Sequence, residues 1–177
     1  GWSVAGIGRR VRLVRWGSVT SVPQLGPGER FEAFVEQHEA PIRHALIAQL
    51  GGDAGREAAS QALLYGLEQW DRVGSMSNPA GYLFRVGQRL GRRTRRRRVV
   101  LNVSQPAMEP WVEPELAAAL GRLPEAQRVA VVLRHGDDLS YAEIAEFVGS
   151  SEAAARKNVE RALRSLRRAL KVEMSDV

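Results

Sequence analysis

The sequence contains no cysteine, few aromatic residues (6% of the chain) and three histidines. Without thiols there can be no disulfide framework and no thiolate metal site, so nothing in the composition requires an oxidising compartment. His38, His44 and His135 do not follow a metal-ligand spacing, and the sequence has no phosphate-binding glycine loop or nucleophile motif. An enzyme is therefore the poorest interpretation, and we predict neither a metal nor another cofactor.

Long hydrophobic runs are also missing. No stretch approaches the ~20 apolar residues that cross a bilayer. Arginines interrupt every apolar run in residues 1–28, which therefore do not resemble a secretory signal. We expect a cytoplasmic protein with no membrane insertion, in which residues 1–28 are a disordered basic extension.

Charge is abundant and unevenly distributed along the 177 residues. The net charge is +6, but residues 29–71 and 99–150 each carry −5, whereas residues 72–98 carry +9 and residues 151–177 carry +3. The stretch 85–98 holds eight arginines and no acid. This pattern predicts two separate places that bind a polyanion, and it leaves the acidic blocks for another partner.

Helical periodicity begins in the N-terminal half. Apolar residues at steps of three and four over residues 31–50 predict a helix with one buried stripe, kinked or restarted at Pro41. Gly51 and Gly52 are expected to end this helix, and Asp53 to cap a second one. The expected buried stripe of the second helix is Ala59, Ala62, Leu63, Leu67 and Trp70.

A short loop, Val73–Ser77, should lead into a third helix. Asn78 followed by Pro79 predicts its N-cap and first turn, and the helix then enters the arginine-rich stretch. Tyr82 and Phe84 beside the arginines give the mixture of rings and cations that binds single-stranded DNA, although both also fit a buried core. Its expected inner face is Tyr82, Leu83, Val86 and Leu90.

Residues 99–112 contain two prolines and no stable period, so they predict a flexible linker. After the linker, Pro114 and Pro124 each mark the start of a helix. The second of these helices should bury Val129, Val132 and Leu133. No strand pattern competes with this reading, and we predict an all-α chain of two small helical domains.

The C-terminal end predicts a helix-turn-helix. Ser140 and Glu143 form a capping box ahead of a short helix, which Gly149 should end. Ser150 or Ser151 should cap a long basic helix that follows. That last helix is expected to bury Ala155, Val159, Ala162, Leu166 and Leu170.

The same period turns several polar side chains of the last helix outward. The first turns of a recognition helix enter the major groove, where cations reach guanine acceptors. Arg156 and Lys157 are therefore the best candidates for contacts with base edges. A solvated charged face is the alternative for any isolated basic helix. Contacts to phosphates are expected from Arg161, Arg164, Arg167 and Arg168.

The two halves resemble a known family. "RFEAFVEQHEAPIRHALIAQLGGDAGREAASQALLYGLEQWDRV", followed by "NPAGYLFRVGQRLGRRTRRRR", resembles region 2 of extracytoplasmic-function (ECF) sigma factors of the sigma-70 family. "LPEAQRVAVVLRHGDDLSYAEIAEFVGSSEAAARKNVERALRSLRRAL" resembles their region 4. The resemblance covers roughly residues 29–171. It implies a region 2 bundle of three to four helices at 29–98, the linker at 99–112, a region 4 helix-turn-helix at 113–171 and a tail at 172–177.

The resemblance also implies partners and residue roles. The second helix would bind the clamp helices of the largest subunit of RNA polymerase core, through Glu57, Ser60, Gln61, Leu64, Glu68 and Trp70. The melted minus-ten element of promoter DNA would contact Arg72, Ser75, Met76, Ser77, Asn78, Tyr82, Arg85, Arg89, Arg92 and Arg93. The minus-thirty-five element would contact Ser151, Glu152, Ala153, Arg156, Lys157, Glu160, Arg161 and Arg164. An anti-sigma factor is left open as a further partner.

Region 2 departs from the family pattern in two places. Ser60 and Gln61 stand where the family usually has Gln and an acid. Arg89 and Arg93 stand where it usually has Asn and Asp. Two other functions therefore stay open: a dimeric helix-turn-helix regulator, which would leave the N-terminal half without a task, and a sigma-like decoy that does not itself support initiation.

Overall fold

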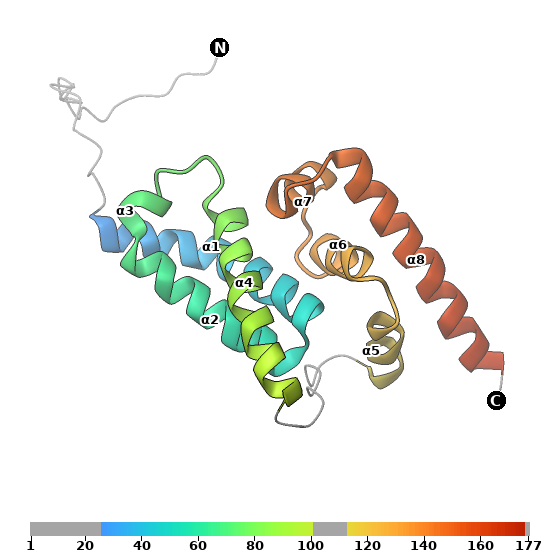
Figure 1. Ribbon diagram of the computed structural model, residues 1–177. Helices are drawn as coiled ribbons and strands as arrows, with labels where there is room; N and C mark the ends of the chain where they lie inside the picture. The colour runs from blue at the N-terminus through green and yellow to red at the C-terminus, as the bar shows by residue number, and fades with distance from the viewer. Residues whose placement is uncertain (1–25, 101–112, 176–177) are drawn as a thin grey trace, which may run out of the picture.

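The computed structural model describes residues 26–100 and 113–175. Within these residues α-helix is the only regular secondary structure, which confirms the predicted fold class (Figure 1). Of the expected disordered extension, residues 1–28, residues 1–25 lie outside the described residues, and so do residues 101–112 of the expected linker. Pro27 and Gly28 already belong to the first helix, and Val99 and Val100 are still part of the helix before the linker, so these two boundaries differ from the prediction. The helices are α1 (Pro27–Leu50), α2 (Gly52–Glu68), α3 (Trp70–Val73), α4 (Pro79–Val100), α5 (Pro114–Gly121), α6 (Glu125–His135), α7 (Tyr141–Val148) and α8 (Glu152–Ser175).

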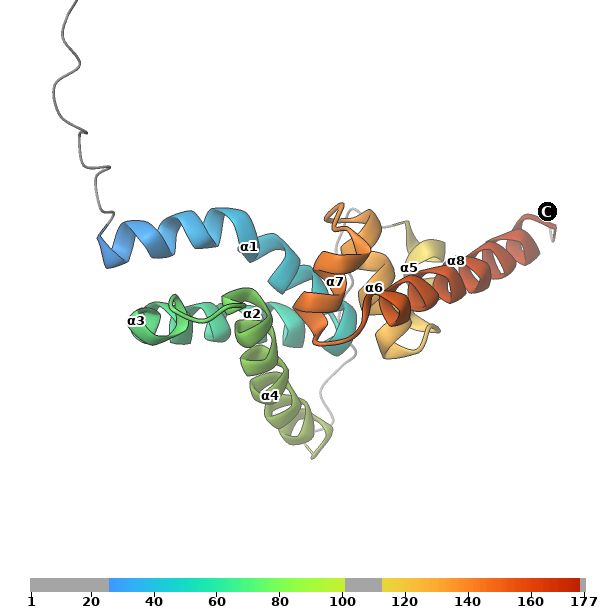
Figure 2. The ribbon, with the colours of Figure 1, turned by 90° about the horizontal axis from the view of Figure 1, so that it is seen from above.

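The predicted first helix is present, and it does not end and restart at Pro41. α1 is continuous through Pro41, and Figure 2 shows that it bends along its length. Its buried stripe includes Phe31, Phe34 and Leu46, as the periodicity predicted. His38 packs beside Phe34, with the ring centroids 4.8 Å apart, and burial lowers the pKa of its imidazole.

The junction between α1 and α2 differs from the prediction. Gly51 ends α1 with a φ of 92°, a conformation that favours glycine, and its N–H donates to the carbonyl of Ile47. Gly52 already belongs to α2, so Asp53 lies inside the first turn and is not the N-cap. Its carboxylate instead pairs with Arg56 at 2.7 Å.

The buried face of α2 is made of small residues. Because α1 and α2 pack with their backbones close together, this face has no room for long side chains. Leu67, expected to be buried, is 51% exposed, and Leu64 is 56% exposed. Ala59 and Ala62 are buried as predicted. The buried residues of α2 are Gly52, Ala54, Gly55, Ala58, Ala59, Ala62 and Gly66.

A short extra helix, α3 (Trp70–Val73), lies where the sequence predicted the end of one helix and the start of a loop. The Trp70 ring lies 5.1 Å from that of Phe31 and 4.9 Å from that of Phe34. Val73 is fully buried. The loop to α4 therefore begins at Gly74.

The C-terminal half follows the predicted order of helices. Within α6, Val129 and Leu133 are buried as expected, but Val131 is buried in place of Val132, because this face packs on α5 and α8. α8 buries Ala155 and Val159, and its helix continues to Ser175, past the expected domain end at residue 171.

The two halves lie against each other. α6 packs on α1, and α7 packs on the N-terminal part of α4, while α8 lies at the outer edge of the C-terminal half (Figures 1 and 2). One continuous buried cluster includes residues of both halves, among them Ile42, Phe84, Leu133 and Phe147.

Candidate nucleic-acid interface

The helix-turn-helix is fixed by local hydrogen bonds. The N–H of Glu143 donates to the Ser140 hydroxyl at 3.2 Å, and the N–H of Ser140 donates to the Glu143 carboxylate at 2.7 Å. Gly149 ends α7 in the left-handed conformation, with a φ of 73°. Ser151, one of the two expected caps, accepts the N–H of Ala154 at 3.2 Å and begins α8. The predicted capping box and turn are thus confirmed.

The Ser140 cap gives a direct stability test. Ser140→Ala is expected to lower the free energy of unfolding by about 1 kcal/mol, the usual effect of removing an N-cap hydroxyl. Hydrogen bonds with Ser140 lower the pKa of Glu143 below its ordinary value of 4.5. The part of the contribution that comes from the Glu143 carboxylate is present above pH 4.5 and is lost as the pH falls through the lowered pKa. The difference in stability between the two proteins should therefore shrink in acid without vanishing, because the Ser140 hydroxyl still accepts the N–H of Glu143.

Urea denaturation at several pH values measures both effects. Ser150→Ala is the matched control, because the Ser150 hydroxyl reaches a carbonyl at 3.5 Å and caps no helix. Equal stability of Ser140→Ala and wild type at neutral pH would contradict the role of the box.

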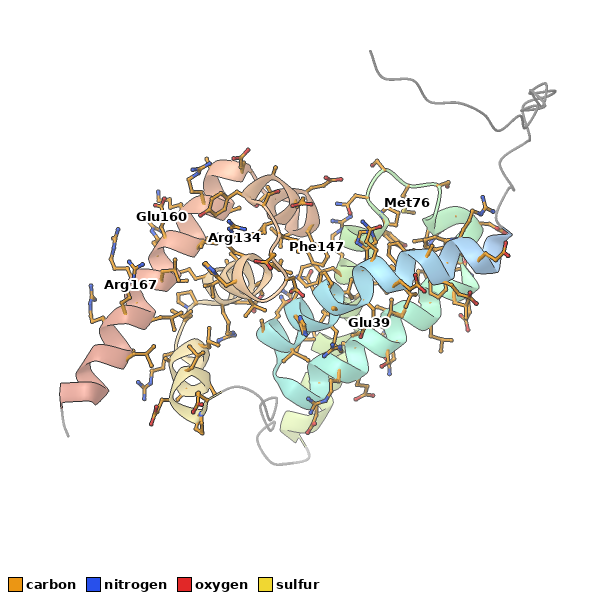
Figure 3. The ribbon with its side chains drawn as sticks, turned by 180° about the vertical axis from the view of Figure 1, so that it is seen from behind. Glu39, Met76, Arg134, Phe147, Glu160 and Arg167 are labelled. Carbon is orange, nitrogen blue, oxygen red and sulfur yellow. The ribbon has the colours of Figure 1, made fainter. Side chains whose placement is uncertain are left out.

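The outer face of α8 is open to solvent. Figure 3 shows Glu160 and Arg167 on the side of α8 that faces away from the rest of the molecule. Within residues 26–100 and 113–175, no element covers the face that was predicted to read the upstream element. Its exposed residues are Ser151, Glu152, Ala153, Arg156, Lys157, Glu160, Arg161, Arg164, Arg167 and Arg168.

Arg156 is held in place by two neighbours that the sequence did not reveal. Its guanidinium lies 4.7 Å from the centre of the Tyr141 ring and donates to Glu152 at 3.1 Å. Arg134 of α6 also lies over this ring, at 5.4 Å, and donates to the carbonyl of Leu139. Tyr141 therefore links α6, α7 and the first turn of α8. Tyr141 directly follows the N-cap Ser140, and this position in the capping box is the sequence signal that could have identified Tyr141 as a contact of α8.

The second basic surface belongs to α4. Arg85, Gln88, Arg89, Arg92 and Arg93 line an open groove of about 440 Å³ along this helix. The four arginines are all exposed, as a phosphate-binding surface requires. In Figure 2, α4 projects away from the layer formed by α1 and α2, so its basic part is accessible.

A cluster of two tyrosines and one arginine supports the loop before α4. The Tyr65 and Tyr82 hydroxyls lie 3.2 Å apart, and Arg72 donates to both. The hydrogen bond with Tyr82 is the main cause that raises the pKa of Tyr65. Tyr65 was not among the predicted site residues, because its position on α2 gives no sign that it reaches α4. The Ser75 hydroxyl donates to the Arg72 carbonyl at 2.8 Å and shapes the loop.

The predicted downstream residues are not equally accessible. Arg72, Ser75 and Ser77 are exposed, whereas Met76, Asn78 and Tyr82 are half-buried. Met76 lies in the loop that joins the N-terminal helices (Figure 3). Phe84 is 2% exposed and packs on Phe147 across the junction of the halves, so of its two interpretations the buried core is the one that the structure supports.

The α2 surface expected to meet polymerase is exposed along one side. Glu57, Ser60, Gln61, Leu64 and Glu68 are all exposed, and the Gln61 amide donates to Glu57 at 3.3 Å. Leu67, which was predicted to be buried, adds an exposed apolar side chain to this surface. Trp70, the remaining residue of the predicted set, is half-buried in the aromatic cluster with Phe31.

Two further features of the described residues bear on function. Residues 26–100 and 113–175 bring together no group of three histidine or acidic side chains that could hold a metal ion. In the same ranges, every helix is too short or too polar to span a bilayer.

The chain is similar to known proteins in both sequence and fold. Residues 114–166 match the family model of sigma-70 region 4. Sigma factor RpoE from Bartonella quintana, solved in complex with the anti-sigma factor NepR, has a similar fold. It has 21% sequence identity and a TM-score of 0.60, and the match covers 80% of this chain and 97% of that chain.

Another match, from the RsbN–BldN complex, has 22% identity over 78% of this chain and 89% of that chain, but its TM-score of 0.32 is too low for a comparison of folds. No curated protein sequence matches the chain. The resemblance drawn from the sequence is confirmed for its C-terminal half, because residues 114–166 match sigma-70 region 4, and the chain has a fold similar to that of sigma factor RpoE.

Proposed function

We propose that this protein is a non-catalytic sigma factor of the ECF type that binds RNA polymerase core and directs initiation at a restricted set of promoters. The observation that carries the proposal is the open basic face of α8 in a region 4 that is joined to a second helical domain with its own basic helix. A simple helix-turn-helix regulator would have no use for that second domain. Such a function would place the protein in the cytoplasm, with polymerase and promoter DNA.

Three separate surfaces would bind polymerase, the minus-ten element and the minus-thirty-five element. The exposed side of α2 would bind the clamp helices of the largest polymerase subunit. The loop from Arg72 to Asn78, with α4, would hold the melted minus-ten strand. The N-terminal part of α8 would read the minus-thirty-five element. Because RpoE was solved with the anti-sigma factor NepR, we propose an anti-sigma protein as a partner here as well.

Initiation itself is the decisive test. Purified protein should comigrate with polymerase core and yield run-off transcripts from some members of a promoter library. Comigration without transcripts would favour the sigma-like decoy, which the altered residues Ser60, Gln61, Arg89 and Arg93 make a specific alternative. Binding to duplex DNA without comigration would favour the regulator.

The polymerase surface can be tested separately on α2. Leu64→Lys is expected to weaken binding to core by about tenfold or more, because it places a charge at an exposed apolar anchor of the proposed interface. The fold should be unaffected, since 56% of Leu64 is already exposed.

Binding is measured by titrating core against labelled protein. Ala33→Lys is the matched control, because it makes a similar change at an exposed position of α1. If both variants bind core like wild type, the α2 surface is not the contact.

A further inference from the structure

The Tyr141 ring is held by the packed part of the C-terminal half. Tyr141 directly follows the Ser140 cap, is half-buried and packs against the hydrophobic core. Arg134 of α6 lies over the ring, 5.4 Å from its centre, and its guanidinium donates to the carbonyl of Leu139 at 3.1 Å. Figure 3 shows Arg134 between α6 and α8. The ring is therefore fixed from the core side, although it borders the exposed face of α8.

Arg156 of α8 is exposed but restrained from two sides. Its Cζ lies 4.7 Å from the centre of the Tyr141 ring, closer than the Cζ of Arg134. Its Nη2 donates to Glu152 Oε1, one turn earlier on α8, at 3.1 Å. The side chains of Arg156 and Glu152 are each 54% exposed, and an exposed ion pair one turn apart on a helix stabilises little. The ring is therefore the main restraint on Arg156.

This arrangement leaves the guanidinium able to read a base. Stacking on a ring uses the flat face of the group, whereas its five N–H donors point outward in its plane. The contact with Glu152 is made through Nη2, so other N–H groups of Arg156 can still reach the two major-groove acceptors of a guanine. An arginine without such neighbours has many rotamers, and the entropy lost when one is selected weakens binding. A guanidinium that is already oriented loses less.

Orientation and charge have different consequences for DNA binding. The attraction between a cation and the phosphates falls off gradually with distance and carries no sequence information. A paired contact with guanine requires the two donors to be aligned with two acceptors. A contact that orients Arg156 should therefore change the difference in affinity between a right and a wrong sequence more than it changes the affinity for DNA in general.

We propose that Tyr141 is the positioning residue of Arg156: it holds the guanidinium in its base-reading direction before α8 meets DNA, and so sets how sharply α8 discriminates between upstream elements. This inference rests on the proposed function, in which α8 reads the minus-thirty-five element. Tyr141 acts through Arg156 and has no need to touch a base itself.

Four proteins separate the ring of Tyr141 from its other properties. Tyr141→Phe keeps the ring and loses the hydroxyl, whereas Tyr141→Leu loses the ring and stays apolar. Arg156→Ala removes the group that the ring would orient, and the double variant completes a double-mutant cycle. Wild type first selects its preferred element from a pool of random duplexes. Each protein is then titrated with that duplex and with a scrambled one, and the ratio of the two affinities is the discrimination.

Tyr141→Phe should discriminate like wild type, because a phenylalanine ring also attracts a cation. Tyr141→Leu should lower the discrimination by about threefold to fivefold, the factor that corresponds to an exposed cation–π contact, and should change the affinity for the scrambled duplex by less than about twofold. Where Arg156 is already alanine, Tyr141→Leu should have no further effect. A role of Tyr141 in packing alone would lower the discrimination in both backgrounds.

A second measurement needs no substitution. In the free protein, NMR order parameters of isotope-labelled arginine Nε–H groups report side-chain motion on the picosecond to nanosecond timescale. Arg156 should be more ordered than Arg164, an exposed arginine of the same helix. In Tyr141→Leu, Arg156 should become as mobile as Arg164. Urea denaturation establishes that this variant is folded.

Any of four results would overturn the proposal. They are an Arg156 as mobile as Arg164 in wild type, a Tyr141→Phe that loses as much discrimination as Tyr141→Leu, a loss for Tyr141→Leu that is the same with and without Arg156, and a wild type that selects no sequence from the pool. Comigration of wild type with polymerase core is assayed separately. If the protein does not bind core but Tyr141 and Arg156 are coupled, the proposed function fails and this inference holds for a helix-turn-helix regulator.

Discussion

Replacing Gly55 with alanine is expected to lower the free energy of unfolding by about 3 kcal/mol or more, at the upper end of what overpacking costs. A Cβ at this position would lie 2.4 Å from Ile47 Cα, 2.5 Å from Ile47 N and 2.8 Å from the carbonyl carbon of Leu46. All three are backbone atoms of α1. A rotamer change cannot relieve these contacts, so α1 and α2 would have to move apart along the centre of the N-terminal half.

Alanine substitutions at other glycines provide a comparison for the loss of stability expected at Gly55. Alanine at Gly87 or Gly91 would meet mainly the side chains of Leu46 and Leu50, which can change rotamer, so a smaller loss is expected. Gly121→Ala is the control, because no atom lies within 4 Å of its Cβ. Urea denaturation of the variants gives the comparison. A Gly55→Ala protein within about 1 kcal/mol of wild type would mean that α1 and α2 do not pack this closely.

The elements that could be predicted from sequence are those determined by neighbouring residues. The capping box at Ser140 and the N-cap at Asn78 each require contacts across three residues, and both formed as predicted. The outer face of α8 could also be predicted. The helical period places Ala155 and Val159 on one side of the helix, which is buried, and turns Arg156 and Lys157 to the exposed side. Asp53 failed as a cap because Gly51 lets the chain turn directly from α1 into α2.

The contacts that could not be predicted join residues far apart in the chain. Leu67 looked buried because large apolar residues usually mark the core, whereas α2 packs through alanine and glycine. The prolines of the linker suggested two independent domains. Nothing in the local sequence indicates that Asn78 reaches Glu146, 68 residues later, or that His44 meets Asp137. The contact between the halves joins helices that are distant in the sequence, and a periodic pattern does not encode such pairings.

The two kinds of cation on α8 are expected to behave differently when removed. Contacts with base edges specify sequence, whereas phosphate contacts position the protein without reading it. Arg156→Ala or Lys157→Ala should weaken binding to the preferred upstream element by about 1–3 kcal/mol and reduce discrimination between promoters. Arg164→Ala or Arg167→Ala should weaken binding to all duplexes alike and lower the salt dependence by roughly one unit per lost phosphate contact.

The structure makes this comparison a sharp one, because all four side chains are exposed and lie along one helix. None of these substitutions removes a buried contact, so the fold should be the same in every variant. Binding isotherms on the best promoter and on a scrambled duplex, at several salt concentrations, separate the two effects. Equal losses on both duplexes for the Arg156 and Lys157 variants would make these residues phosphate contacts and move the reading face elsewhere on α8. If none of the four variants changed duplex binding, α8 would not be a recognition helix, because its first turns offer no other exposed cations.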